Sequence, residues 1–449
     1  MTDYDRMCKT NVYKLIVLLG IPTTISMLIT NIYNLADTYF VGTLGEGPQA
    51  ATSVLFTLQC IIQAIAFMLG HGAGTYISKH LANNNKQMAS KYISTSYFLG
   101  IFLGGGLLIF GLIFLEGFVK FLGSTEESVP FAMDYGMWIM ISAPFMVCSL
   151  ILNNALRYEG KAFYAMFGLV SGGLLNILGD YIFINVMHMG VFGAGMSTGI
   201  SQIISFIILM ILFFYHSETK LSIRFFSFNK DIITNIIRRG FPSLIRQGLT
   251  AISNGVLNVI CKASGDALQA AMGIVSRYIN FVLCIGIGIG QGFQPFVAFN
   301  YSAKKFNRVK RGFIFTLILS FSVVFIISLA GVIVPHFLVS LFQKEDAVIE
   351  YGGTALRYAS IGIMFVPICT TCNMLYQSIR KSFIASMLAL FRSGLVFIPL
   401  IYILEPTIGI LGIQISMPIS NMFAGLISIP FIILFLKKCP NEDVVSLEV

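Results

Sequence analysis

The chain is poor in charged residues. Only 11% of its 449 residues are Asp, Glu, Lys or Arg, and 56% are hydrophobic. A soluble domain carries about 25% charged residues, and the mean hydropathy of this chain is +0.83. Because apolar segments follow one another nearly from end to end, the composition excludes a soluble enzyme held by one membrane anchor.

Several chemical signatures are also missing. The chain lacks the GxxxxGK[ST] motif that holds the phosphates of ATP, so no ATP-driven mechanism is implied. Its eight cysteines are scattered, and the one CxxC spacing, Cys369–Cys372, lies in an apolar run with no second ligand pair. We therefore expect no cofactor. The polar start, Met1–Asn11, predicts no cleavable signal peptide.

The chain does contain twelve apolar runs long enough to cross a bilayer, for which about 20 residues suffice. These runs predict an all-α integral membrane protein with twelve transmembrane helices. The predicted spans are Leu15–Val41, Ala51–Ile77, Tyr92–Leu115, Phe131–Leu152, Ala162–Val186, Val191–Tyr215, Phe241–Cys261, Ala270–Phe299, Phe313–Val334, Leu356–Tyr376, Phe383–Leu404 and Ile408–Leu436.

The basic residues set the orientation, because Lys and Arg collect on the cytoplasmic side of membrane proteins. Most of the 29 basic residues fall in loops after even-numbered spans or at the termini. This pattern predicts both termini in the cytoplasm and a multi-pass protein of the cytoplasmic membrane, in contact with the lipid bilayer. The net charge of +9 then reflects orientation, and we expect no nucleic-acid partner.

An internal repeat divides the chain. Gly20–Pro22 (GIP) recurs 220 residues later as Gly240–Pro242 (GFP), and the same offset aligns further Ile, Thr, Asn, Ala and Gly residues. The repeat predicts two pseudo-symmetric six-helix lobes of equal orientation, related by an axis along the membrane normal, with a central cavity between them. The lobes are residues 1–217 and 218–449.

The cytoplasmic linker between the lobes covers residues 216–239. It contains an amphipathic stretch, around Ile223–Ile237. Such a stretch predicts an interfacial helix that lies on the inner leaflet of the membrane.

Two carboxylates lie inside predicted spans, Asp37 and Asp180. An acidic side chain in hydrocarbon costs about 2.5–3.5 kcal/mol on insertion scales, so it is rare unless it serves a function. The repeat places Leu257 at the position of Asp37 and a residue near Ile403 at that of Asp180. The sequence therefore predicts an asymmetric ion site in the N-terminal lobe.

Polar residues near these acids complete the predicted site. Asn176 and Asp180 are four residues apart and share a helix face, as do Tyr33 and Asp37. Thr198, early in the sixth span, reaches a similar membrane depth. Such an all-oxygen set can coordinate Na⁺, or it can hold a shared proton because two close buried carboxylates raise one pKa. Each polar group could instead satisfy a neighbouring helix.

The fourth span adds Asn153 and Asn154, which either line the same lobe or serve packing. The second half carries Arg246, Arg277 and Arg392 within its spans and no acid in the seventh or tenth span. Cationic side chains in spans are consistent with a cavity that accepts anionic groups, so a transporter of anionic substrates stays open at this point.

The chain resembles the MATE family, the multidrug and toxic compound extrusion transporters, and is most similar to its bacterial members. The resemblance covers all twelve spans. It rests on Asn34–Gly42 (NLADTYFVG), the Gly-rich end of the second span, Asn176–Asp180, and Gly290–Pro295 (GQGFQP) leading to Asn300–Tyr301.

The resemblance implies a V-shaped pair of six-helix lobes. It also implies antiport of an inward-moving H⁺ or Na⁺ against outgoing small molecules, often cationic, aromatic and amphipathic. In relatives with an ion site in the first lobe, four residues hold the ion. The resemblance maps these residues onto Asp37, Asp180, Asn176 and Thr198 of this chain. Tyr135 and Asn153 match cavity positions of such relatives.

We therefore expect an alternating-access multidrug efflux antiporter of xenobiotic compounds, with no obligatory protein partner. Cation uptake at Asp37 and Asp180 would shift the first helix, with Pro22 as the hinge. The alternative is a flippase or exporter of lipid-linked saccharides, which the three span-embedded arginines would suit. Remoter alternatives are an intramembrane aspartyl enzyme and a passive channel.

Overall fold

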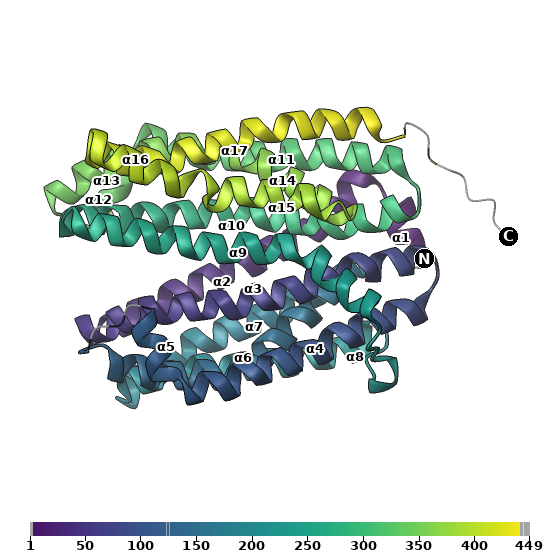
Figure 1. Cartoon of the computed structure of the whole chain (residues 1–449), viewed down its shortest axis with the longest axis horizontal. Coiled ribbons are helices and arrows are strands. Elements are labelled where there is room, and N and C mark those ends of the chain that lie inside the picture. Colours follow the sequence, from purple (N-terminus) through teal and green to yellow (C-terminus); the bar gives the residue numbers. More distant parts are fainter. Residues whose placement is uncertain (1–2, 123, 125, 441–442, 444–449) are drawn as a thin grey trace. The chain divides into compact units, whose positions relative to one another are not determined.

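The computed structural model of the chain describes residues 3–122, 124, 126–440 and 443. Within these residues the regular elements are helices (Figure 1). The termini beyond residues 3 and 443 lie outside the described part, and so does their predicted cytoplasmic placement.

The helices of the first half form the order α1 to α8, with a π-helix η1 after α7. Their bounds are α1 Asp3–Lys9, α2 Val12–Gly42, α3 Glu46–Ala82, α4 Lys86–Ile113, α5 Leu115–Phe121, α6 Val129–Tyr158, α7 Ala162–Asp180, η1 Tyr181–Val186 and α8 Gly190–His216.

The second half begins with a short 3-10 helix, η2, and contains a second π-helix, η3. The bounds are η2 Ile223–Phe225, α9 Lys230–Ala263, α10 Asp266–Ser302, α11 Phe306–Ile333, α12 Pro335–Ser340, α13 Asp346–Ile363, α14 Val366–Ser378, α15 Ser382–Leu390, η3 Phe391–Leu395, α16 Phe397–Ile408 and α17 Ile410–Lys438.

Ten of these helical segments are long and apolar enough to cross a membrane, and an eleventh is the pair α13 and α14, bent by 40° at its break. The chain is therefore a multi-pass membrane protein with ten to eleven candidate spans by length and composition. The predicted seventh span, Phe241–Cys261, is helical as part of α9 but is not among them. Its helix carries Arg246, Asn254 and Asn258, which lower its apolar character.

The helices group into two compact units. Unit 1 consists mainly of Ile25–Gln247, and unit 2 of Asp5–Thr24 together with Gly248–Val449. The contacts thus divide the chain within two helices, α2 and α9. The first half of α2 packs in unit 2, and the first half of α9 packs in unit 1, whereas the sequence placed the lobe boundary after residue 217.

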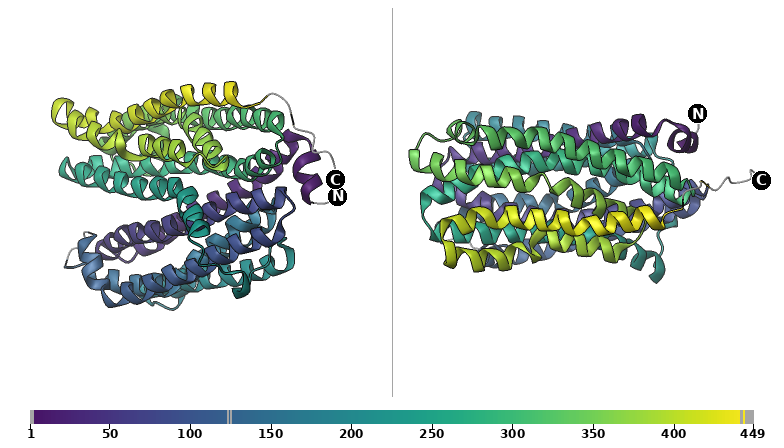
Figure 2. Two further views of the ribbon diagram at one scale, coloured as in Figure 1. Left: turned by 45° about the vertical axis from the view of Figure 1, so that its right-hand side comes forward. Right: turned by 90° about the horizontal axis from the view of Figure 1, so that it is seen from above.

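In unit 1, α6 is the central helix. It packs against α3, α4, α7 and α8, which run side by side with it in Figures 1 and 2. Its candidate span is 72% buried, far more than the 22–53% of the other unit 1 spans. Buried Val, Leu, Ile and Ala side chains from these helices form one hydrophobic core. Side chains on α6 are therefore well placed to join neighbouring helices.

The two helices that are divided between the units, α2 and α9, pack closely on their neighbours through glycines. These glycines occupy equivalent positions of the repeat. In unit 1 a Cβ on Gly72 of α3 would collide with the Ile236 carbonyl, and one on Gly240 would collide with the Met68 carbonyl. In unit 2 a Cβ on Gly292 of α10 would collide with the backbone of Gly20. Small residues let helix backbones approach closely in membranes. The repeat therefore encodes the same backbone contact in both units.

In unit 2, α10 packs against α11, α13 and α14, while α17 packs against α13, α14 and α16. A second hydrophobic core fills the space between them. The kink at η3 includes Gly394, whose φ and ψ of 172° and −31° are not helical.

The linker differs from the prediction. The amphipathic stretch Ile223–Ile237 was expected to form one interfacial helix, and this is wrong. Only η2 and the start of α9 from Lys230 are helical, and residues 226–229 between them are extended or irregular. The reason is a tertiary contact: the backbone N–H of Ser227 donates to Thr95 Oγ1 of α4, so it does not need a helix to find a partner.

Candidate functional site

The polar side chains predicted to form the ion site come from four helices of unit 1. Asp37 lies on α2, Tyr135 on α6, Asn176 and Asp180 on α7, and Thr198 on α8. Four of them are at least 95% buried, and Asp37 is half-buried. The hydroxyl and amide groups of the set are directly connected.

A chain of hydrogen bonds runs across these helices. Asn176 Nδ2 donates to Thr198 Oγ1 at 3.0 Å. Tyr135 Oη donates to Asp37 Oδ2 at 2.9 Å and lies 3.0 Å from Thr198 Oγ1. Because the one Tyr135 hydrogen points at Asp37, Thr198 must donate its own hydrogen to Tyr135. The chain therefore has one direction, from the Asn176 amide to the Asp37 carboxylate.

This connectivity leaves four oxygens without donors. Asp37 Oδ1, Asn176 Oδ1 and both carboxylate oxygens of Asp180 are buried and accept no hydrogen bond from the described residues. The nearby Ser197 hydroxyl donates to the Asn176 carbonyl instead, at 2.9 Å. Buried polar atoms are nearly always partnered in proteins. A cluster of four orphan acceptors is therefore a place where a proton or a cation fits.

The two carboxylates also affect one another. The negative charge of Asp37 acts on Asp180, and both act on the Tyr135 hydroxyl. In a buried site such repulsion is strong because little solvent screens it. Binding of a positive ion relieves both the repulsion and the unmet hydrogen bonds.

Glycines bring the site helices close together. A Cβ on Gly195 of α8 would lie 2.8 Å from Tyr135 Cα, and one on Gly173 of α7 would lie 2.7 Å from Ile29 of α2. A Cβ on Gly179 would collide with the Ser197 hydroxyl. Bulkier residues at these places would push α6, α2 and α8 away from their partners.

Asp180 is the last residue of α7, and the π-helix η1 follows it directly. Short π-helical segments within α-helices are rare and are frequent at functional sites. The π-helical turn begins directly after Asp180, whose two carboxylate oxygens lack donors. This coincidence points to a functional role for the end of α7.

The remaining predicted residues lie apart from this chain of bonds. Tyr33 is buried one turn before Asp37, with Gly173 against its ring. Asn153 Nδ2 donates to the Ala165 carbonyl at 2.7 Å, and Asn154 Nδ2 donates to the Leu150 carbonyl at 2.7 Å. The two asparagine amides are thus engaged in helix packing. Tyr33 is close enough for the Asp37 charge to act on it.

A second polar cluster in unit 1 was missed at the sequence level. Arg157, 1% exposed at the end of α6, donates from Nη2 to His71 Nε2 at 2.9 Å and to Asn154 Oδ1 at 2.5 Å. His71 Nδ1 lies 2.6 Å from Ser243 Oγ. Because arginine only donates, His71 Nε2 must accept, so His71 is neutral and its Nδ1–H donates to Ser243.

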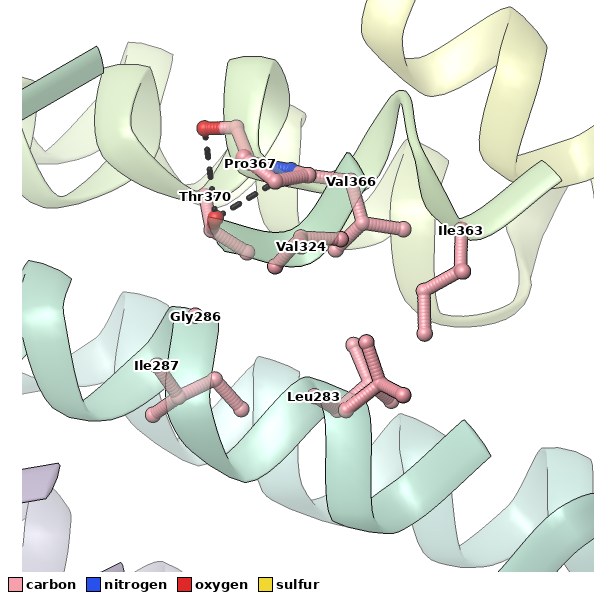
Figure 3. A pocket seen from close by; sticks show the side chains of 9 residues that line it. Leu283, Gly286, Ile287, Val324, Ile363, Val366, Pro367 and Thr370 are labelled. Atoms are coloured by element: carbon pink, nitrogen blue, oxygen red, sulfur yellow. Dashed lines mark hydrogen bonds between the residues drawn. The ribbon is translucent and has the colours of Figure 1, made fainter. Parts of the chain in front are cut away.

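A small hollow of about 10 Å³ lies in unit 2, between α10, α11, α13 and α14. Figure 3 shows that its walls are aliphatic side chains such as Leu283, Ile287 and Val324. The Thr370 hydroxyl at its edge already donates to the Val366 carbonyl at 3.0 Å. With no charged group among its lining residues, this hollow does not suit a cation.

The comparisons with known proteins agree with this architecture. A model of the family described as MatE matches residues 22–182 and 242–403, more than half of the chain. The chain belongs to the MatE family. It is therefore a MATE transporter and not an enzyme, which confirms the resemblance found in the sequence. The two matched segments begin at Pro22 and Pro242, in agreement with the 220-residue repeat.

Among curated proteins, this transporter is similar to the multidrug export protein MepA of Staphylococcus aureus strain NCTC 8325 / PS 47. The two are 27% identical over 421 residues, 93% of each chain. MepA of Staphylococcus saprophyticus is 25% identical over 98% of each chain.

Among solved structures, the transporter is similar to one described as the outward-facing conformation of a multidrug resistance MATE family transporter of the MOP superfamily. The TM-score is 0.90, with 25% identity over 98% of this chain and 100% of that one. The likeness establishes the MATE fold.

Proposed function

We propose that this MATE transporter is a cation-coupled antiporter that exports drug-like, amphipathic and often cationic compounds across the cytoplasmic membrane of a bacterium. The proposal extends to this chain the multidrug export for which MepA is named. It includes twelve membrane crossings with α9 as the seventh, two six-helix lobes at residues 1–217 and 218–449, and both termini in the cytoplasm.

The observation that carries the proposal is the set of four buried oxygens without donors on Asp37, Asn176 and Asp180. In our proposal these residues and Thr198 bind the coupling ion. The described residues contain no group of three or more His, Cys, Asp or Glu that could hold a metal. A Na⁺ ion would therefore use neutral oxygens besides the two carboxylates, while a proton would be shared between the acids.

Coupling requires that ion and drug favour different states of the transporter. With the ion bound, the two carboxylates no longer repel one another and α2 can pack closely on α7. Pro22 lies two residues before the point where α2 passes from unit 2 to unit 1. A proline removes one backbone hydrogen bond of a helix, so Pro22 is the proposed hinge through which ion binding alters the first helix and releases the drug outward.

The test is dye transport in proteoliposomes. Molecules whose cytoplasmic face points outward should carry a fluorescent cationic dye into the lumen when an ion gradient is directed out of the lumen. A pure pH gradient and a pure Na⁺ gradient are imposed in separate experiments. Transport under one gradient alone identifies the coupling ion, and no transport under either gradient contradicts the proposal.

Three variants sharpen the test. Asp37→Asn and Asp180→Asn should each reduce gradient-driven uptake to the level of protein-free liposomes, because each removes a negative charge from the ion site. Asp134→Asn changes an exposed acid early in α6 and should transport normally. Normal uptake by the first two variants would rule out the assigned site. Movement of a lipid-linked saccharide but not of cationic dyes would favour the flippase alternative.

A further inference from the structure

The segment between α8 and α9 lies along α4 in unit 1. We call residues Ser217–Asn229 the strap. Lys220 N donates to Ser90 Oγ at 2.9 Å, and Ser222 N donates to Ser94 Oγ at 3.2 Å. Farther along, Ser227 N donates to Thr95 Oγ1 at 3.2 Å. Hydroxyl groups on α4 thus hold the strap backbone at three successive points.

These contacts follow α4 away from its Lys86 end. A helix rises about 1.5 Å per residue, so Thr95 lies about 13 Å along the axis from Lys86. Because α4 is a candidate membrane span, the strap descends from the end of α4 toward the bilayer. Phe226 reaches still farther and packs edge-to-face on Phe98, with ring centroids 5.7 Å apart.

Apolar side chains project from the strap into the surroundings. Ile223 is 72% exposed and Phe228 is 84% exposed. Phe228 also rests edge-to-face against Phe226, with ring centroids 4.5 Å apart. Exposed hydrophobic side chains grouped beside a membrane span fit a contact with lipid.

Positive charge accompanies these apolar side chains. Lys220, Arg224 and Lys230 are exposed. Between Thr219 and Arg239 the chain has five basic residues and one acid, Asp231. Glu218, at the start of the strap, already forms ion pairs with Lys86 and Lys161. The strap and the start of α9 together therefore present a net positive surface beside the exposed apolar side chains.

We propose that the strap, together with Lys230 at the start of α9, is a docking site for anionic phospholipids. Ile223 and Phe228 contact the acyl chains, while Arg224 and Lys230 bind the phosphate-bearing headgroup. Basic residues beside a membrane attract anionic lipid, and apolar side chains anchor an interfacial segment in the acyl boundary. The proposal does not depend on which compounds the transporter exports.

The single tryptophan of the chain, Trp138, permits a direct test. A Trp138→Phe, Phe228→Trp variant is reconstituted in phosphatidylcholine vesicles that contain either phosphatidylglycerol or phosphatidylcholine with brominated acyl chains, at equal mole fraction. Bromine quenches tryptophan fluorescence on contact. We expect strong quenching, and more of it from the brominated phosphatidylglycerol. A Trp138→Phe, Gln87→Trp variant, changed at the exposed first turn of α4, should be quenched much less.

Charge variants in the same tryptophan background test the headgroup contact. Each removed charge should lower the preference for phosphatidylglycerol about fivefold, so Arg224→Gln with Lys230→Gln should nearly abolish it. Arg224→Lys with Lys230→Arg keeps both charges and should keep the preference. Lys437→Gln with Lys438→Gln, at the end of α17, is the matched control.

Three results would overturn the proposal. The first is an unquenched tryptophan at position 228, which would place the strap outside the bilayer. The second is equal quenching by the two brominated lipids. The third is an equal loss of preference in the α17 control, because it would assign the effect to the net charge of the protein and not to the strap. A double Gln variant that does not fold is replaced by the two single variants, for which the same fivefold losses are expected.

Discussion

Tyr135 on α6 donates a hydrogen bond to Asp37 on α2 across 2.9 Å, and its hydroxyl also lies 3.0 Å from Thr198 on α8. One hydroxyl thus joins three helices around an acidic side chain in a membrane span. It is the only link from Asp37 to the other polar groups among the hydrogen bonds of the described residues. Its removal is therefore a sensitive test of the site.

Replacement of Tyr135 by Phe should lower gradient-driven dye uptake. The variant leaves Asp37 Oδ2 without its donor and Thr198 without its acceptor, while the ring still fills its place. An unmet buried partner costs about 1–3 kcal/mol, so the apparent thermal stability should also fall. Tyr39→Phe removes a hydroxyl from an exposed ring on α2 and should change neither quantity. Equal transport by the two variants would show that the Tyr135 hydroxyl is dispensable.

Replacement of Gly195 by Ala should destabilise unit 1. Its Cβ would lie 2.8 Å from Tyr135 Cα, so α6 and α8 must separate, and such overpacking costs about 1–3 kcal/mol. The shift also moves Tyr135 away from Thr198 and should reduce transport. Gly105→Ala on α4 is the matched control, because no atom lies within 4 Å of that Cβ. Thermal unfolding of the purified variants measures the difference, and identical melting temperatures would contradict the packing argument.

Replacement of His71 by Ala should destabilise the protein more strongly. It removes one of the two acceptors of Arg157 and leaves a cavity; a hydrogen bond to a charged group contributes about 1.5–3 kcal/mol, and the cavity adds to that loss. His71→Gln keeps a carbonyl oxygen that can accept from Arg157, and glutamine is the residue at the equivalent position of the repeat, Gln291. We expect this variant to regain most of the lost stability. If Ala and Gln variants melt alike, the Arg157 contact contributes little.

The buried carboxyl of Glu159, which follows α6, predicts a pH dependence of stability. Burial raises its pKa, and hydrogen bonds from Thr219, Ser217 and the Glu218 N–H partly offset the effect. Because the folded-state pKa exceeds the unfolded value, this contribution to stability is present below the unfolded pKa and is lost as the pH rises through the folded pKa. The melting temperature of the wild type minus that of Glu159→Gln should therefore decrease from low to neutral pH.

Glu116→Gln provides a control of opposite sign. Lys120 lowers the pKa of the exposed Glu116, so its contribution is present above the unfolded pKa and is lost as the pH falls. The melting temperature of the wild type minus that of Glu116→Gln should rise slightly or stay constant with increasing pH. If this difference in melting temperature falls with pH for Glu116→Gln, or rises with pH for Glu159→Gln, the stated pKa directions of the two carboxyl groups are wrong.

The membrane helices were largely predictable because span length and apolarity are properties of a local stretch of sequence. Prediction was weaker where a helix depends on its neighbours. The helix α9 carries Arg246 in a span that is not apolar by itself. The stretch Ile223–Ile237 has a helical pattern, although the backbone N–H of Ser227 in its first part donates to α4. In both places tertiary contacts decided between local alternatives.

The site divides in the same way. Asp37 and Asp180 could be selected because a carboxylate in a span is costly, and Asn176 because it lies one turn from Asp180. Tyr135 came only from the family resemblance. Arg157 follows a predicted span and precedes Glu159, as an ordinary basic loop residue would, and nothing in its sequence context signals its contact with His71.

The sequence by itself determined that the chain crosses a membrane many times, repeats after 220 residues, and places two acids in the first half alone. These features depend on composition, periodicity and spacing. The tertiary structure decided which oxygens meet, in which direction their hydrogens point, and which acceptors are left for an ion. Those hydrogen bonds join residues that are up to 98 positions apart, and they exist only because glycines on α7 and α8 let four helices approach one another.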